Sequence, residues 1–146
     1  MPAAPLSVVL SFVEGINRGD VQGLGWLMTE GHELKVFDEA ALVGRDANLA
    51  AWRGYVEAYP HYVIYPHRVV ERRGEVAIRG HTTGSHLGLT DEEERQVTLI
   101  WLAQVVEGMI HSWSLVQDTA ANRQRFGLDA AAGPTDCTAP RAANVG

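Results

Sequence analysis

The hydrophobic positions in the first 30 residues recur with the 3.6-residue period of an α-helix. In residues 6–18 the apolar side chains fall on one helical face, namely Val8, Val9, Phe12, Val13 and Ile16. Ser7 is a candidate N-cap for this helix. Asp20 can cap a second helix that runs to about Glu30, where Gly31 is a natural stop.

A third helix is predicted after a short extended stretch at residues 33–43. It begins near Asp46, which is a candidate cap, and ends at Pro60 because proline cannot continue a helix. Its apolar side chains again share one face, at Leu49, Trp52, Val56 and Tyr59.

From His61 onward the apolar period falls to two, which is typical of β-strands. Alternating stretches flank turns at residues 72–75 and 107–108, so two antiparallel hairpins are predicted. If the first turn pairs Arg72 with Glu75, His61 lies opposite His86. We expect the acidic run at residues 91–94, between the hairpins, to be a solvated loop.

Helices gathered on one side of an antiparallel sheet predict an α+β fold with a cavity between the two layers. We expect one domain over residues 1–128. The remaining residues 129–146 are rich in alanine, glycine, proline and threonine, and we expect them to form a flexible tail.

Composition excludes several classes of function. The chain has 146 residues and a net charge of −6. This negative charge argues against binding to nucleic acids and against binding to an anionic membrane surface. No apolar run approaches the roughly 20 residues of a membrane span, and no secretory signal is evident, so a cytoplasmic location is expected. Cys137 is the only cysteine, which excludes an internal disulfide.

Three stretches carry a resemblance to a known family: SFVEGINRGDVQGLGWLM, RGHTTGSHLG, and MIHSWSLVQD followed by NRQRFGL. Over residues 6–128 the chain resembles the SnoaL-like, polyketide cyclase-like family of the nuclear transport factor 2-like superfamily. The resemblance implies a curled antiparallel sheet with three N-terminal helices around a conical pocket. It also implies a homodimer formed through the outer face of the sheet.

The same resemblance implies that Asp118 is a catalytic acid/base, because SnoaL-like cyclases carry an aspartate at the matching end of this strand. In an apolar cavity the pKa of Asp118 would be raised. The cyclases pair this aspartate with a histidine, but the matching position here is Gln104 or Leu102. His86 is therefore the candidate second catalytic residue, with His61 as another source of imidazole.

The alternative for Asp118 is a carboxylate that caps the following segment, or one that pairs with Arg123 or Arg125 at the surface. We expect the substrate to be a small hydrophobic compound, because aromatic residues are available for the pocket wall. The predicted substrate-binding residues are Tyr65, Trp101, Trp26, His61 and Ser114.

No metal site is predicted, since no histidine pair shows a spacing such as HxH or HExxH. No cofactor is expected either. Two functions remain open: a cofactor-independent cyclase, isomerase or dehydratase, and a non-catalytic binding or dimerisation module. An epoxide hydrolase ranks last, because Arg79 and Asp118 supply only two members of the required Asp-Arg-Asp set.

Overall fold

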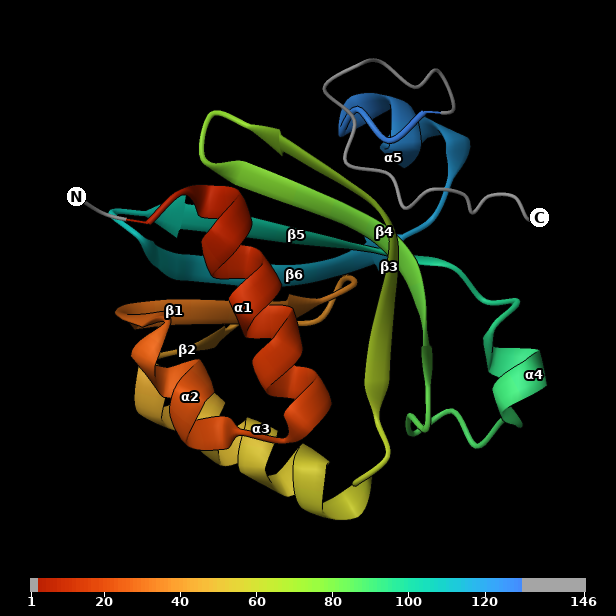
Figure 1. The fold of residues 1–146 in the computed structure, drawn as a ribbon, viewed down its shortest axis with the longest axis horizontal. Coiled ribbons are helices and arrows are strands. Elements are labelled where there is room, and N and C mark those ends of the chain that lie inside the picture. Colours follow the sequence, from red (N-terminus) through yellow and green to blue (C-terminus); the bar gives the residue numbers. More distant parts are fainter. Residues whose placement is uncertain (1–2, 130–146) are drawn as a thin grey trace.

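The computed structural model describes residues 3–129, which form a six-stranded curled sheet with helices on both faces (Figure 1). The strand order is β2-β1-β6-β5-β4-β3, and all neighbours are antiparallel except β1 and β6. The helices are α1 (Pro5–Arg18), α2 (Val21–Trp26), α3 (Arg45–Ala58), α4 (Asp91–Glu94) and α5 (Ala120–Arg125). The strands are β1 (Met28–Val36), β2 (Leu42–Val43), β3 (Val63–Arg72), β4 (Glu75–Thr83), β5 (Leu99–Val106) and β6 (Met109–Gln117).

Helix α1 confirms the predicted amphipathic face, since the five predicted side chains are its buried residues. Its N-cap is Ala4 and Pro5 occupies the first turn, so the predicted cap at Ser7 is wrong. Proline suits this position because its missing N–H would have no helical partner there.

Helix α2 confirms the predicted cap, because the Asp20 carboxylate accepts a hydrogen bond from the Gly23 N–H at 3.0 Å. The predicted end near Glu30 is wrong, and Gly31 lies inside β1. Pairing with β6 draws Met28 and the residues after it into a strand, so tertiary contacts override the helical pattern. The N-cap of helix α3 is Gly44, two residues before the predicted Asp46, so the predicted cap is wrong.

A β-bulge at His67 divides the first hairpin into two registers. From Arg72–Glu75 to Arg68–Arg79 the pairing is as predicted, and beyond the bulge it shifts by one residue. Tyr65 therefore pairs with His81. Both strands end before the predicted pair of His61 and His86, so that prediction is wrong.

A second bulge changes the faces of the β5–β6 hairpin in the same way. Val106 pairs with Met109, but past the bulge Trp101 pairs with Leu115 and Leu102 pairs with Ser114. Because side chains alternate along a strand, this one-residue shift turns Ser114 away from the face that carries Trp101.

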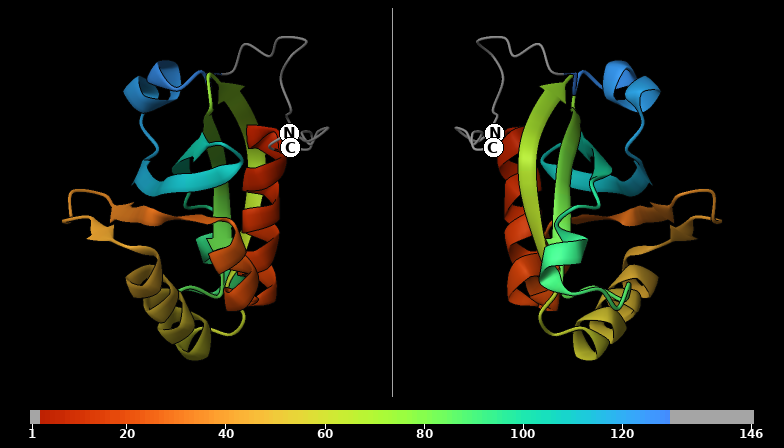
Figure 2. Two further views of the ribbon diagram at one scale, coloured as in Figure 1. Left: turned by 90° about the vertical axis from the view of Figure 1, so that its left-hand side faces the viewer. Right: turned by 90° about the vertical axis from the view of Figure 1, so that its right-hand side faces the viewer.

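The two faces of the sheet are covered by different parts of the chain (Figure 2). The inner face packs against α1 and carries the main core, which includes Phe12, Ile78 and Trp101. On the outer face Phe126 and Leu128, at and after the end of α5, pack on β4 and β5. The chain itself thus covers part of the face through which a homodimer was expected, and the dimer stays a prediction.

The acidic run between the hairpins is a short helix, α4, with a capping box at Thr90 and Glu93. Asp91, Glu92 and Glu93 are exposed, but Glu94 is buried, so the prediction of a solvated loop is wrong for that residue. All of the predicted tail except Asp129 lies outside the described residues. Within residues 3–129, no helix combines the length and apolarity needed to cross a membrane.

Candidate functional site

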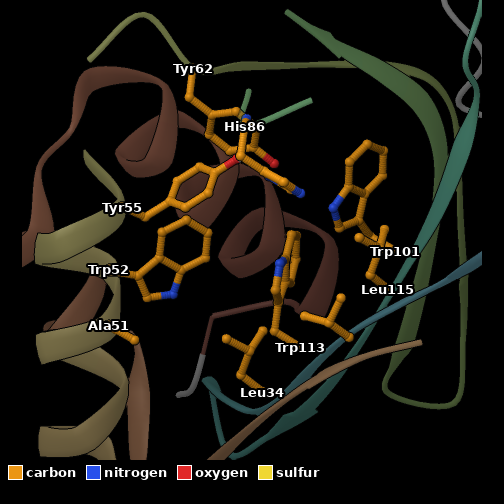
Figure 3. Close-up of a pocket in the computed structure, with 10 residues that line it drawn as sticks. Leu34, Ala51, Trp52, Tyr55, Tyr62, His86, Trp101, Trp113 and Leu115 are labelled. Atoms are coloured by element: carbon orange, nitrogen blue, oxygen red, sulfur yellow. The ribbon is translucent and has the colours of Figure 1, made fainter. Parts of the chain in front are cut away.

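A cavity of about 200 Å³ lies between α3 and the inner face of the sheet (Figure 3). Its walls are almost entirely apolar or aromatic, and no carboxylate lines it. The lining residues are Leu34, Val36, Ala51, Trp52, Tyr55, Tyr62, His86, Trp101, Trp113 and Leu115.

Each element presents its lining residues through its own periodicity. On β1 and β6 the lining residues are two apart, because alternate side chains of a strand share a face. On α3 Ala51 and Tyr55 are four apart, because residues one turn apart share a helical face. The Trp113 ring packs against the ring of Phe12 on α1, with 4.9 Å between the ring centroids.

His86 is the only histidine among the lining residues, and Tyr55 holds its ring. The His86 backbone N–H donates to the Tyr55 hydroxyl oxygen at 3.2 Å. The same oxygen lies 2.8 Å from His86 Nδ1. When the Tyr55 hydroxyl donates its proton to Nδ1, a neutral His86 imidazole carries its own proton on Nε2.

The other ring nitrogen of His86 points into the cavity, toward the indole nitrogen of Trp101 (Figure 3). Both groups are N–H donors in this arrangement. The site therefore offers two donors that converge on one place in a mostly aromatic wall, to which Trp52 adds a buried indole N–H without a hydrogen-bond partner among the described residues.

The two tyrosines of the cavity stay protonated. Burial raises the pKa of Tyr55 and raises the pKa of Tyr62 further, since desolvation disfavours the phenolate. Tyr55 thus remains a hydroxyl donor toward His86, and the cavity has no phenolate or carboxylate to act as a strong base.

Glu94 holds the loop that carries His86 through hydrogen bonds, a role that the sequence did not predict. Its carboxylate accepts hydrogen bonds from the Thr82 hydroxyl and, at 3.4 Å, from the Ser85 N–H. Ser85 directly precedes His86. The sequence does contain a capping box at Thr90 and Glu93, which predicts a short helix that includes Glu94. A residue of a short helix has a more fixed position than a residue of a solvated loop.

Asp118 lies outside the cavity, on the outer-face side of the sheet. Its side chain is 5% exposed and accepts hydrogen bonds from Arg79 Nε at 2.8 Å and from Arg123 Nη1 at 2.7 Å. The Thr98 hydroxyl donates a third hydrogen bond. Burial alone would raise the pKa of Asp118, but the three donors together outweigh it and lower the pKa. The predicted raised pKa is wrong, and the predicted alternative, a pair with Arg123, is present.

The other predicted site residues divide between the two faces. Trp101 and His86 line the cavity, as predicted. Tyr65 and Ser114 lie on the outer face because of the two bulges, and Tyr65 stacks on His81 with 4.7 Å between centroids.

His61 and Trp26 are also separate from the cavity. His61 is exposed just before β3, and the Trp26 side chain on α2 is 74% exposed. The aromatic cavity residues that the sequence did not predict as site residues are Trp52, Tyr55, Tyr62 and Trp113, and the aliphatic ones are Leu34, Val36, Ala51 and Leu115. In the described part of the chain no three His, Cys, Asp or Glu side chains gather as a metal site would require.

Residues 9–113 match the SnoaL-like domain family. The chain belongs to the SnoaL-like family. The match covers well over half of the sequence. It includes most of α1, all of α2 and α3, strands β1 to β5 and the first part of β6. A search of curated proteins by sequence finds no match.

Solved structures show the same fold at low identity. A cystatin-fold protein from Novosphingobium aromaticivorans aligns with a TM-score of 0.69 at 12% identity, over 79% of this chain and 99% of that one. TerC, co-crystallised with polyporic acid, aligns with a TM-score of 0.64 at 14% identity, over 85% and 99%. The epoxide hydrolase/cyclase-like enzyme SalBIII aligns with a TM-score of 0.65 at 16% identity, over 79% and 91%. At these identities the likeness establishes the SnoaL-like fold and no particular activity.

Proposed function

We propose that the cavity binds a small, flat, mostly apolar compound that carries a hydrogen-bond-accepting oxygen. The observation that carries this proposal is the convergence of His86 and Trp101 on one place in an aromatic wall. A carbonyl oxygen placed there would accept from both N–H groups while its rings stack among the tryptophans. TerC, a protein of the same fold, was crystallised with polyporic acid, which supports small-ligand binding within this fold.

The size of the cavity narrows the ligand class. At about 200 Å³ it is smaller than the roughly 300–1,000 Å³ of sites for drug-sized ligands. A compound of one or two fused rings fits this volume, whereas a long polycyclic chain does not. The lack of a lining carboxylate favours a neutral ligand over a cation.

The test uses the bicyclic ketone 2-tetralone and its hydrocarbon analogue tetralin, which lacks the oxygen. The protein variant Trp26→Phe removes the exposed tryptophan, so that fluorescence comes from Trp52, Trp101 and Trp113 in the cavity wall. We expect 2-tetralone to quench this emission and to bind about tenfold more tightly than tetralin, the difference that one good hydrogen bond provides.

The matched control is Trp101→Phe, which keeps an aromatic ring and removes the indole N–H. This variant should lose most of the preference for the ketone over the hydrocarbon. Equal affinity for both compounds in the parent protein, or no saturable quenching by either, would contradict the proposed recognition of an oxygen.

A second candidate function is proton transfer on the bound ketone, favoured by the orientation of the His86 ring. With Nδ1 held by Tyr55, the Nε2–H can hydrogen-bond the carbonyl oxygen as negative charge develops there. A proton on the carbon next to the carbonyl then leaves to water and an enolate forms. Return of a proton from solvent to that carbon restores the ketone, so atoms and charge balance.

Deuterium incorporation separates binding from catalysis. In D₂O, NMR would follow exchange at the carbons next to the carbonyl of 2-tetralone. Faster exchange with the parent protein than with His86→Gln supports proton transfer. Equal rates at equal ligand occupancy would leave a binding protein without this activity.

A further inference from the structure

A second, separate groove lies on the surface between α2 and α3, away from the aromatic cavity. It measures about 490 Å³ and is bounded by Val21, Gln22, Gly25, Trp26, Arg45, Leu49 and Arg53. Figures 1 and 2 both show α2 and α3 side by side at this place. The two helices approach closely beside the groove, since a Cβ at Gly25 would lie 3.0 Å from a Leu49 methyl carbon.

Trp26 dominates one wall of the groove. Its side chain is 74% exposed, the largest value among the exposed large hydrophobic residues of the described chain. The other three tryptophans are buried. An indole held in water on a short helix contributes nothing to the core, and tryptophan is the residue most enriched at the energetic centres of protein interfaces.

The opposite wall carries two arginines that the fold itself does not use. Within residues 3–129 neither Arg45 nor Arg53 forms an ion pair or a side-chain hydrogen bond. No carboxylate is among the residues that line the groove, although the chain as a whole carries a net charge of −6. The charged residues that line the groove are therefore both positive, although Glu30 and Asp46 line a neighbouring hollow together with Arg45. The two arginines suit an acidic partner.

The position of Arg45 is a further sign that the groove has a purpose other than stability. Arg45 is the first residue of α3, where the helix dipole places partial positive charge. A cation there is unfavourable by itself. Asp46 in the same turn offsets part of its charge, but within residues 3–129 the Arg45 side chain forms no direct ion pair. Local choices that oppose the fold are expected at functional sites.

The spacing of the two arginines indicates how far apart the acidic residues of a partner would have to be. Along α3, one helical turn separates Arg45 from Leu49 and another separates Leu49 from Arg53. The Cα atoms of the two arginines are therefore about 12 Å apart along the helix axis. In an extended peptide, two residues four apart are separated by roughly 13 Å, and the residue midway between them projects on the same side. Two acidic residues at this spacing would meet the arginines while an apolar residue between them meets Leu49 and Trp26.

We propose that the α2–α3 groove binds an extended acidic segment of a partner protein, of the form acid–x–apolar–x–acid. Arginine is well suited to this role because its planar fork pairs with carboxylates. The segment does not come from a second copy of the described chain, because no described stretch has this pattern. The groove is independent of the aromatic cavity, so the proposal stands apart from the proposed function.

The test uses the acetylated, amidated peptide GESFSEG as the probe. Two control peptides have the same length: GKSFSKG reverses the charges, and GEESFSG moves the acids next to each other. The readout is the Trp26 indole N–H signal in a ¹H–¹⁵N NMR spectrum, supported by protection of Trp26 fluorescence from acrylamide. We expect GESFSEG to shift the Trp26 signal in a saturable way that weakens as salt is added.

The paired variant Arg45→Gln/Arg53→Gln should lower the affinity for GESFSEG by about tenfold or more. Its melting temperature should equal or exceed that of the parent, because it removes an unfavourable charge from the start of α3. Arg53→Gln alone gives an intermediate loss and serves if the double variant is poorly folded. Lys35→Gln, which removes an exposed charge on β1, should change nothing.

Three outcomes overturn the proposal. One is a Trp26 signal that GESFSEG leaves unmoved, and another is equal binding of GEESFSG. The third is binding of Trp26 to phosphatidylglycerol vesicles with no response to the peptide, which would assign the groove to a membrane surface.

Discussion

On the inner face of the sheet, His86 lines an aromatic cavity that holds no carboxylate. On the outer face Asp118 is enclosed by two arginines, close to the hydrogen-bonded pair of His67 and His81. Both regions contain groups that proton chemistry requires, but their surroundings differ. The three donors around Asp118 leave it stabilised as a carboxylate, whereas the ring of His86 keeps one nitrogen directed at open space. Reactive side chains therefore mark a binding site only where a cavity accompanies them.

The largest expected effect comes from Asp118→Asn. It removes the negative charge from between Arg79 and Arg123, whose side chains are about one-third exposed. Because solvent screens those arginines in part, we expect a loss of about 2 kcal/mol in the free energy of unfolding. Urea unfolding measures this loss, and Asp38→Asn, at an exposed carboxylate, is the control.

The same variant sharpens the comparison between the faces. If Asp118 only stabilises the fold, Asp118→Asn should bind 2-tetralone with the same affinity as the parent protein at urea concentrations below those that unfold it. A large loss of affinity for 2-tetralone in a folded Asp118→Asn protein would indicate instead that Asp118 belongs to the ligand-binding or catalytic site.

Tyr55→Phe tests the inner face with a smaller change. It removes the hydroxyl that holds His86, so the ring loses its fixed orientation. We expect about tenfold weaker binding of 2-tetralone and a stability loss of about 1 kcal/mol, the value of one hydrogen bond. Fluorescence titration and urea unfolding measure the two effects. Tyr59→Phe is a matched control, since Tyr59 is a neighbouring tyrosine that does not line the cavity.

The sequence predicts the elements of this fold better than it predicts the site. Helical periodicity identifies the buried face of α1, and the alternating pattern identifies both hairpins. The two bulges escape such a pattern, because one extra residue leaves each strand recognisable but moves every later side chain to the other face. For this reason Tyr65 and Ser114 were assigned to the wrong face, while Trp101 was assigned correctly.

Burial and pairing explain the remaining differences. Asp118 meets Arg79 across 39 residues and Thr98 across 20, so its environment depends on strand order and register. Tyr55 reaches His86 across 31 residues in the same way. These contacts decide protonation and orientation, and neither periodicity nor composition encodes them.

Protonation of the outer histidines provides a pH-dependent prediction. Desolvation lowers the pKa of both His67 and His81. The charge of Arg79 lowers the pKa of His67 further, and His67 and Arg95 lower that of His81. Desolvation also lowers the pKa of the buried His32. In the unfolded chain these groups take up protons near their usual pKa of about 6.5, so the unfolded state binds more protons than the native state below that pH.

Stability should therefore fall as the pH drops below about 6.5, by at most about 1.4 kcal/mol per pH unit for each such group. Urea unfolding between about pH 7.5 and pH 5 measures the slope. His81→Gln should flatten it, because that variant removes one titrating group and the partner of His67. An unchanged slope would show that the pair does not contribute.

Glu94→Gln should have the smallest effect. The amide keeps the size of the buried side chain but is a weaker acceptor for Thr82 and Ser85. The loop that carries His86 should become less ordered, and affinity for 2-tetralone should fall by about two- to threefold. Titration of this variant beside exposed Glu92→Gln gives the comparison. A loss as large as that of Tyr55→Phe would mean that Glu94 acts on the cavity directly.

The four tryptophan indole N–H signals in a ¹H–¹⁵N NMR spectrum report directly on which region binds the ligand. Three of the tryptophans line the cavity and Trp26 lies outside it. Addition of 2-tetralone should shift the signals of Trp52, Trp101 and Trp113, with the largest shift at Trp101, and leave Trp26 unchanged. If the indole signals stay in place and the backbone amides of Thr98 and Asp118 shift instead, the ligand binds at the outer face and the account given for the cavity is wrong.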